Sequence, residues 1–566
     1  MLASTSPHVE TVKVNNIRPV CVCVFIALGA FIFGYDTGCI SGALIMEDFE
    51  ERFGTLQADG SYALGASRES LIVSFISIGT IIGAIGQSFT SDWIGRKWSI
   101  LFWSVIFTIG SVIQTASDHA IYQLCVGRLV AGLGVGSMSA LVSLFSGEVA
   151  PTRLRGLMLT MYTVMNSFGI FLSYVISLAS HNLVDSSASW RIPVGVQIPL
   201  GLILCIGIFF IPESPRRLIY LGKDDEARKA LGFINGYPAE SGAVTELVEE
   251  IKVGMAKENE GGGSTWKDCF GKEVRSRMIH GIILQMLQQF SGQNYYYYYG
   301  ASFFEQSGTG LNGWEVQSVM GSVALLFSFA ALLVIDGLGR RKALMFGAAG
   351  QGACAIVVAV VGRIMLAPDG TPEDQFTQKN RTGGAVVVAF ALIHLACYNA
   401  LSGSIPWVFL GESFPTRLRA KGVTIGTTSN WIWNFLIAFF SPRIASSIGP
   451  LIMLIFAVMM GVQIVYVYTL LRETKGLSLE SVDEMYRAKV LPWKSSKWQP
   501  TVGGPREKSK GLFKRKATEE DDDSPNRTAV PTPSQSKENV TEVYGTYSVK
   551  DDKVATRRSL ESVVAV

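Results

Sequence analysis

The chain has 566 residues, of which 17% are charged, and its mean hydropathy is +0.31. Soluble globular domains carry roughly 25% charged residues, so this composition argues against a soluble enzyme. Lysine and arginine exceed aspartate and glutamate by only three residues, 49 against 46, which argues against a nucleic-acid-binding protein.

Twelve long apolar runs follow a polar amino-terminal tail, residues 1–19. A helix of roughly 20 apolar residues crosses a bilayer, so we expect an all-α membrane protein with twelve transmembrane helices. The runs cover approximately residues 20–43, 70–90, 99–116, 120–146, 157–180, 192–211, 279–305, 315–336, 343–366, 384–410, 423–445 and 449–471. Glycines inside them, such as Gly79, Gly83 and Gly132, are expected to let helix backbones approach closely.

The loops after the even-numbered runs are rich in lysine and arginine, and the positive-inside rule places such loops in the cytoplasm. Because the number of spans is even, both termini are expected to be cytoplasmic. The eight cysteines lie mostly in apolar runs and show no spacing typical of metal ligands. We therefore expect no metal and no cofactor.

A polar stretch, residues 212–278, separates the first six runs from the last six. Its amphipathic patterns, such as DDEARKALGFI, predict an intracellular helical linker between two six-helix bundles, 20–211 and 279–471. The carboxy-terminal tail, 472–566, is expected to be cytoplasmic and, from about residue 488, disordered because of its composition. An outer loop contains the sequon Asn380-Arg381-Thr382, which makes Asn380 a candidate glycosylation site.

The two halves repeat the same motifs in the same order. Asp92-Trp-Ile-Gly-Arg96 follows the second run and Asp336-Gly-Leu-Gly-Arg340 follows the eighth. GEVAPTRLRG (147–156) follows the fourth run and GESFPTRLRAKG (411–422) follows the tenth. A duplicated six-helix unit is the architecture of many transporters, which hold their substrate midway between the halves.

Several further motifs, together with this repeat, resemble the sugar porter family of the major facilitator superfamily, and its fungal hexose transporters in particular. They are FGYDTGCISG (33–42), GRLVAGLGVG (127–136), PESPRRL (212–218), QQFSGQN (288–294) and SNWIWNF (429–435). The resemblance covers roughly residues 20–485. It implies the major facilitator fold, with two pseudo-symmetric bundles, and a transporter rather than an enzyme.

The same resemblance implies an inner gate of ion pairs that holds the two halves together while the cavity opens outward. Several charged pairs on one face can bias a two-state equilibrium, by a few kcal/mol in all. The alternative is that these charges serve only to orient the helices in the membrane. The residues at the matching positions are Asp92, Arg96, Glu148, Arg155, Asp336, Arg340, Glu412 and Arg419.

A sugar site needs side chains that both donate and accept hydrogen bonds, together with aromatic rings for the apolar C–H faces. The seventh run supplies adjacent amides that fit this requirement, and the resemblance assigns a wider set to the pocket. That set is Gln288, Gln289, Asn294, Trp407, Asn430, Trp431 and Asn434, with Thr163 where family members usually carry glutamine. The tyrosine run 295–299 predicts either a gate over the pocket or an interfacial aromatic belt.

Thr163, Ala324 and Ser404 depart from the family pattern and shorten or remove hydrogen-bonding groups. These departures leave room for a pentose, another hexose or a sugar acid as the substrate.

Asp36 lies deep in the first run, where a lone charge is costly and should be paired or functional. We expect it to pair with Arg128 of the fourth run. By resemblance to the proton-linked sugar porters, Asp36 takes up the transported proton and Arg128 tunes it. The alternative is a static ion pair.

Together these features predict a monosaccharide transporter of the plasma membrane, with a hexose as the expected substrate. It is expected to work by alternating access and to couple sugar transport to protons. Its partners are a monosaccharide, a proton and the lipid bilayer, with a monomer as the functional unit. Two alternatives stay open: a uniporter that allows facilitated diffusion, and a sugar sensor that does not transport.

Overall fold

The computed structural model describes residues 17–57, 60–149, 155–183, 186–259, 265–272, 274–306, 312–367, 375–414, 418–477 and 479–500. The disorder of the tail was expected from about residue 488, but the 3-10 turn Pro492–Lys497, which buries Pro492 and Ser495, shows ordered structure within the described residues up to 500. The tail beyond residue 500 lies outside the described residues. Within them the chain is almost entirely helical, as expected, and the one described sheet is a short antiparallel pair, β1 (Thr55–Leu56) and β2 (Tyr62–Ala63).

Six membrane spans form the first bundle. Its helices are α1 (Ile17–Ile26), α2 (Leu28–Ala43), α4 (Ala66–Trp93), α5 (Arg96–Thr115), α6 (Ile121–Val149), α7 (Arg155–Ser180), α8 (Ala188–Gly195) and α9 (Gln197–Gly207), the last continued by a 3-10 turn, Ile208–Phe210. The first span consists of α1 and α2, and the sixth consists of α8 and α9. A short helix, α3 (Glu47–Phe53), joins the first two spans.

The second bundle repeats this pattern. Its helices are α13 (Arg275–Gln289), α14 (Gln293–Gln306), α15 (Gly313–Leu338), α16 (Arg340–Met365), α17 (Gln378–Cys397), α18 (Ile405–Ser413), α19 (Arg419–Ile448) and α20 (Ile452–Thr469). A π-helical segment, Tyr398–Ser402, joins α17 to α18, and a 3-10 turn, Gly449–Leu451, joins α19 to α20.

Ten helical stretches of the described chain are long and apolar enough to cross a membrane. One of them, Arg419–Thr469, contains both α19 and α20, and α13 with α14 supplies a further crossing that is broken in its middle. The twelve predicted spans are therefore confirmed.

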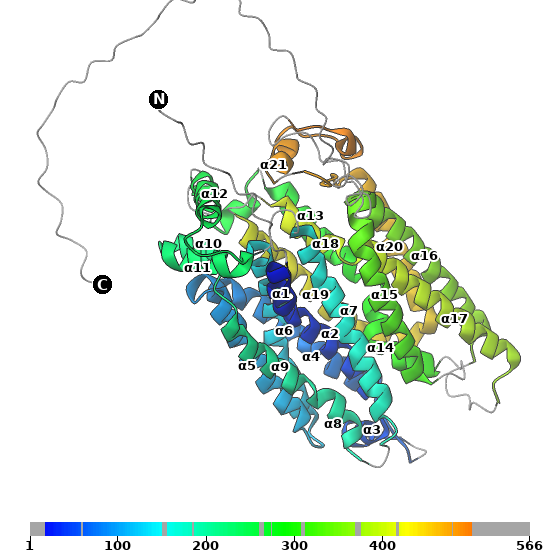
Figure 1. Ribbon diagram of the computed structural model, residues 1–566. Helices are drawn as coiled ribbons and strands as arrows, with labels where there is room; N and C mark the ends of the chain where they lie inside the picture. Colours follow the sequence, from blue (N-terminus) through cyan, green and yellow to red (C-terminus); the bar gives the residue numbers. More distant parts are fainter. Residues whose placement is uncertain are drawn as a thin grey trace, which may run out of the picture. The chain divides into compact units, whose positions relative to one another are not determined.

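The segments outside the spans gather at the two ends of the bundles. Three helices, α10 (Pro215–Tyr220), α11 (Asp224–Asn235) and α12 (Gly242–Asn259), and a 3-10 turn, Lys267–Phe270, lie between the bundles in sequence. They stand at the same end as α21 (Leu479–Arg487) and the 3-10 turn Pro492–Lys497, which we call the linker end. Helix α3 marks the opposite end, the α3 end (Figure 1).

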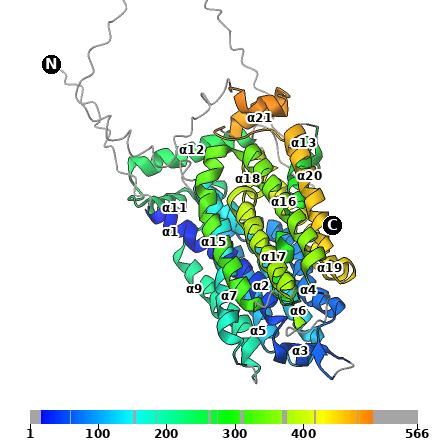
Figure 2. The same ribbon diagram turned by 90° about the vertical axis from the view of Figure 1, so that its right-hand side faces the viewer.

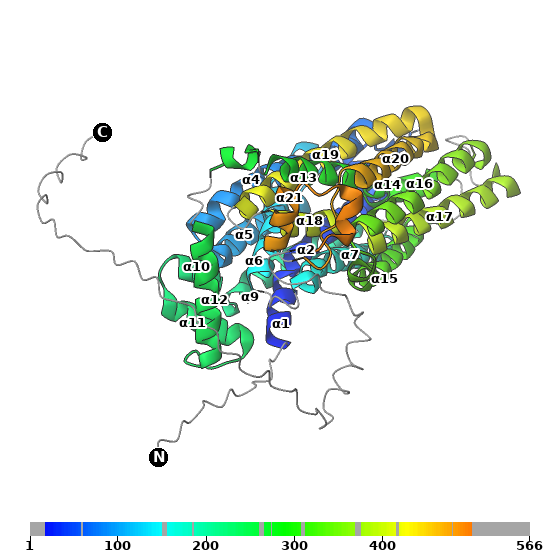
Figure 3. The same cartoon turned by 90° about the horizontal axis from the view of Figure 1, so that it is seen from above.

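The two bundles meet mainly along three pairs of helices. Helix α4 packs along α19, α7 packs along α15, and α2 packs against α14. Figure 2 shows α7 beside α15, and Figure 3 shows the bundles from the linker end.

Glycines explain the closest packing inside the first bundle. A Cβ atom on Gly79 would lie 2.1 Å from the carbonyl oxygen of Leu129, and one on Gly132 would lie 2.2 Å from that of Ile76. Only glycine permits α4 and α6 to approach this closely, which confirms the role expected for these glycines.

The sequon residue Asn380 lies in the first turn of α17. Its side chain completes a capping box with Thr377 and donates to the carbonyl of Met365 (2.9 Å). Glycosylation at Asn380 stays a prediction.

Candidate functional site

A cavity lies where the helices of the two bundles meet. It contains about 570 Å³ of space free of protein atoms, a volume that includes the open solvent at its mouth. Every described residue that lines it is uncharged. The lining residues are Phe33, Thr37, Tyr162, Thr163, Asn166, Ile170, Gln288, Gln289, Gln293, Asn294, Tyr297, Tyr398, Asn399, Gly403, Trp407, Asn430 and Asn434.

A break in the seventh span brings amides from both sides of the break to this cavity. Helix α13 ends at Gln289 and α14 begins at Gln293. Between them Gly292 adopts a positive φ of 87°, and a Cβ atom there would lie 2.7 Å from the ring of Phe456. Glycine is therefore required at the break both for its backbone conformation and for the space available.

The predicted amides form one hydrogen-bonded cluster. Nε2 of Gln289 donates to Oδ1 of Asn430 (2.7 Å), and Nδ2 of Asn430 donates to Oε1 of Gln288 (2.9 Å). Oε1 of Gln289 accepts hydrogen bonds from Asn294 and, at 3.4 Å, from Asn434. Because each amide both donates and accepts, the hydroxyls of a polyol can replace these mutual bonds.

Aromatic rings and a hydroxyl complete the predicted set from both bundles. Trp407 of α18 and Tyr162 of α7 lie with their ring centroids 5.6 Å apart, and the neighbouring Thr163 also lines the cavity. An indole ring offers an apolar face of the kind that the C–H groups of a sugar require.

Trp431 is the one predicted pocket residue that does not line the cavity. Its side chain is buried among the hydrophobic residues of the first bundle, where its ring contacts Phe33 (5.1 Å between centroids). Its indole N–H donates to Oγ of Ser139 on α6 (3.2 Å). In this structure Trp431 therefore links the bundles instead of facing the cavity.

Several lining residues were missed at the level of sequence, and Asn399 is the most informative. It lies in the π-helical segment, donates to the hydroxyl of Tyr297 (3.0 Å) and accepts from Ser167 of the first bundle (3.3 Å). A polar asparagine within an apolar run was the available signal. The irregular segment of this span lies at Tyr398–Ser402, and Pro406 follows it in the first turn of α18.

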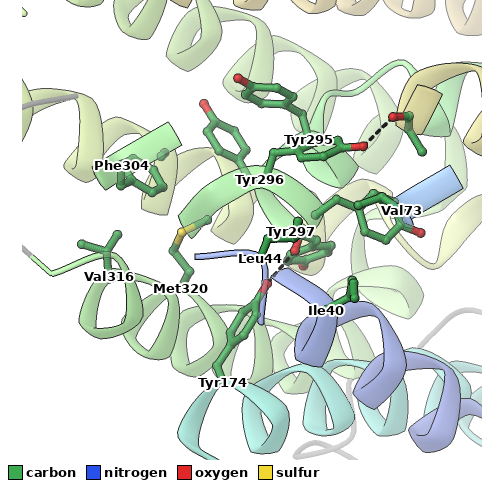
Figure 4. Close-up of a cluster of buried hydrophobic side chains, with 14 of the residues drawn as sticks. Ile40, Leu44, Val73, Tyr174, Tyr295, Tyr296, Tyr297, Phe304, Val316 and Met320 are labelled. Atoms are coloured by element: carbon green, nitrogen blue, oxygen red, sulfur yellow. Dashed lines mark hydrogen bonds between the residues drawn. The ribbon is translucent and has the colours of Figure 1, made fainter. Parts of the chain in front are cut away.

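The tyrosine run belongs to the interior of the protein. All five side chains of Tyr295–Tyr299 are at most 4% exposed, so they do not form a lipid-facing belt. Tyr297 lines the cavity, and its carbonyl accepts a hydrogen bond from Tyr174 of α7 (3.1 Å; Figure 4). This bond joins the two bundles directly beside the cavity.

Asp36 and Arg128 are brought together in the core of the first bundle. Nη1 of Arg128 lies 3.2 Å from each carboxylate oxygen of Asp36, and both side chains are almost completely buried. Arg128 also donates through Nε to the carbonyl of Ile72 (3.2 Å). Asp36 is the neighbour in sequence of Thr37, which lines the cavity.

The charged motifs at the linker end form the same arrangement in each bundle. Arg96 binds Glu148 (2.9 Å), and its backbone N–H donates to Glu213 (3.0 Å). In the second bundle Arg340 binds Glu412 (2.6 Å), and its backbone N–H donates to Glu473 (3.0 Å). Sequence reasoning missed Glu213 and Glu473, although both stand at matching points in the repeat.

These two ion pairs lie within one bundle each and do not cross between the bundles. Asp92 is largely exposed and lies 4.0 Å from Arg96. Arg419 begins α19 at the same end. The side chains of Arg155 and Asp336 lie outside the described residues, so their predicted part in the gate stays a prediction.

Comparison with known proteins gives a consistent result. The family model described as "Sugar (and other) transporter" matches residues 22–486. The chain is 38% identical to hexose transporter 2 of Kluyveromyces lactis, covering 85% of this chain and 84% of that one. It is 39% identical to the low-affinity glucose transporter HXT1 of Saccharomyces cerevisiae, covering 84% and 83% of the two chains.

Solved structures share the fold. The proton:xylose symporter XylE, bound to 6-bromo-6-deoxy-D-glucose, superposes with a TM-score of 0.69 at 23% identity, over 83% of this chain and 100% of that one. A partially occluded, inward-open form of XylE from E. coli gives a TM-score of 0.66 at 23% identity, over 82% of this chain and 100% of that one. The expected major facilitator fold is thereby confirmed.

Proposed function

The chain belongs to the sugar transporter family, and from this premise we propose that it carries a monosaccharide, a hexose in the first place, across the plasma membrane by alternating access. The observation that supports this proposal most is the cavity between the bundles, lined by mutually bonded amides and a tryptophan. Its curated relatives named above are hexose and glucose transporters. No covalent chemistry is involved.

The cavity favours a neutral sugar over a sugar acid. Every described lining residue is uncharged, and a carboxylate moved into such a site would lose its hydration without gaining a cationic partner. Although Thr163 is shorter than glutamine, Asn166 lies one turn further along α7 and supplies an amide to the same cavity.

We place the linker end in the cytoplasm, with both termini, and the α3 end outside. The basic loops of the sequence gather at the linker end, in agreement with the positive-inside rule. On this orientation, the hydrogen bonds that cross between the bundles at the α3 end, such as that from Arg443 to Ser70 (2.6 Å), lie at the outer end of the protein. The monomer is the functional unit in this proposal, with residues 20–211 and 279–471 as the rocking bundles and 212–278 as the linker.

Proton coupling is the finer part of the proposal, and the buried Asp36–Arg128 pair supports it. Protonation of Asp36 removes one of the two charges, so the attraction that holds α2 to α6 is weakened. A change at the cavity wall would thereby be linked to a change in how the helices pack.

Uptake of radiolabelled sugars into cells stripped of their own hexose carriers tests the proposal. We expect saturable uptake of hexoses, weaker uptake of pentoses and none of sugar acids, with external alkalinisation as protons enter. Downhill uptake without any pH change would replace symport by uniport. If no monosaccharide were taken up while a tail-dependent signal persisted, the protein would be a sensor and the proposal would fail.

A further inference from the structure

A second group of buried polar side chains lies outside the sugar cavity, behind the break in the seventh span. His394 of α17 is completely buried, and neither of its ring nitrogens has a hydrogen-bond partner among the described residues. The ring of Tyr296 packs against it, with centroids 5.4 Å apart, and the Tyr296 hydroxyl also lacks a partner there. Neither residue lines the cavity.

Gln351 of α16 belongs to the same group. Its Nε2 donates to the carbonyl of Gly347 (3.0 Å) and to Oγ of Ser402 (2.7 Å), but its Oε1 has no partner in the described part of the chain. The His394 ring faces the backbone carbonyls of Gln351 and Ser291 without bonding to either in good geometry. Orphaned polar atoms of this kind are costly in a core, because a buried donor or acceptor without a partner has lost its hydration without compensation.

The carbonyl of Ser291 belongs to the break itself. The backbone N–H of Tyr295 donates to the carbonyl of Gly292 (3.1 Å), three residues back, so the regular helical ladder does not use Ser291. Backbone groups freed by a break in a membrane helix are satisfied by neighbouring helices, side chains or ordered water. His394 is the side chain that faces this carbonyl from another helix.

We propose that His394, Tyr296 and Gln351 form a buried water-binding site that supports the break in the seventh span from outside the sugar cavity. One water molecule can accept from the Tyr296 hydroxyl and donate to Gln351 Oε1 and to the unprotonated nitrogen of His394. With one ring nitrogen bound to water, the other carries the proton and is directed toward the backbone carbonyls of Ser291 and Gln351, which lie near the ring. His394 is thus a positioning residue, which acts on Gln289 and Asn294 through the break between them.

A double-mutant cycle on the purified full chain tests the water site without any transport assay. Tyr296→Phe and His394→Leu should each lower the unfolding temperature by about 2 °C, because each leaves the water short of a partner. The double variant should lose less than the sum of the two, since one water links both residues. Tyr296→Phe combined with Ser99→Ala, an orphaned hydroxyl on the distant α5, is the additive control.

Changes of the opposite sign in the unfolding temperature would overturn the proposed water site. If His394 and Tyr296 were truly unbonded, removing their polar atoms would raise the unfolding temperature, and the two effects would simply add. Should His394→Leu fail to fold, Tyr296→Phe with Gln351→Leu completes an equivalent cycle.

The positioning role has a separate readout, which rests on the proposed function. His394→Leu should raise the apparent KM for sugar about fivefold at equal surface expression, and His394→Asn, which keeps a donor and an acceptor, should restore it to within about twofold. An unchanged KM in His394→Leu would refute the positioning role. If the native protein moved no sugar, the proposed function would fail, while the unfolding cycle would still decide the water site.

Discussion

At the scale of single residues, the cavity is built from side chains that already bond to one another. Gln289 alone connects Asn294, Asn430 and Asn434. A sugar that enters must replace these bonds by equivalent ones, so the net gain from each contact is small although an unreplaced bond is costly. Removal of one central amide should therefore weaken sugar binding measurably without dismantling the cavity.

Gln289→Ala should raise the apparent KM for the transported sugar about tenfold, the effect of one or two lost hydrogen bonds. Uptake kinetics at equal surface expression measure it. Gln463→Ala is the matched control, because Gln463 is a buried amide of α20 that does not line the cavity. Native kinetics in Gln289→Ala would contradict the assignment of the pocket.

Asp36→Asn should abolish uphill sugar accumulation while leaving exchange of labelled for unlabelled sugar in place. The amide retains an acceptor for Arg128 but cannot take up a proton. Accumulation and exchange assays in the same vesicles separate the two activities. Glu315→Gln, which removes an exposed carboxylate of α15, serves as the control. Continued accumulation in Asp36→Asn would exclude proton coupling through Asp36.

At the scale of elements, short helices outside the membrane spans are stabilised by specific side-chain contacts rather than by the intrinsic helix propensity of their residues. The seven-residue helix α3 buries Phe49 and Phe53 against Trp190, with ring centroids 5.5 and 5.7 Å apart. Asp48 accepts from the Trp190 indole (2.8 Å) and from Arg52 (2.6 Å). A helix this short is not stable alone, so these contacts determine its position.

The charge of Asp48 gives the α3 end a defined dependence on pH. Burial acts to raise the pKa of Asp48, but the hydrogen bonds from Arg52 and Trp190 outweigh it and hold the pKa below its usual value of 3.8. Because the folded pKa is lowered, the stabilisation is complete well above pH 3.8 and is lost as the pH falls through the folded pKa.

Asp48→Asn should consequently lower the free energy of unfolding by about 1–2 kcal/mol at pH 7, with a difference from the native protein that shrinks below about pH 4. Thermal unfolding in detergent across this pH range measures both. Glu51→Gln changes an exposed carboxylate of the same helix and should have little effect. A difference that stayed constant down to pH 3 would contradict the role of the Asp48 charge.

At the scale of the whole molecule, hydrogen bonds cross between the bundles at the α3 end. Arg443 donates to Ser70 (2.6 Å) and Ser302 donates to Glu69 (3.1 Å). The Trp314 indole donates to the carbonyl of Gly42 (3.2 Å). Each such contact stabilises only the form in which this end is closed, so it biases the equilibrium between the closed and open forms.

Arg443→Ala should therefore favour opening at the α3 end. We expect the labelling rate of a cysteine introduced at the cavity by Thr37→Cys, with a membrane-impermeant maleimide, to rise about two- to fivefold in intact cells. Arg363→Ala, at an exposed arginine of α16, is the control. An unchanged rate would show that Arg443 does not contribute to closure.

The sequence by itself determined the number and order of the spans, the repeat of the two halves and the amides of α13, α14 and α19 that line the cavity. Apolar length and loop charge act locally along the chain, and they are therefore readable without coordinates. The partners Asp36 and Arg128 were also predictable, because a buried charge needs an opposite one.

Only the tertiary structure decided which face each helix turns toward the cavity. Asn430 and Trp431 are neighbours in sequence, yet the asparagine lines the cavity and the tryptophan packs into the first bundle. The π-helical segment that presents Asn399, and the restriction of the Arg96 and Arg340 ion pairs to single bundles, were likewise not predictable. Each depends on helix rotation and on contacts between residues far apart in the chain, which no local pattern specifies.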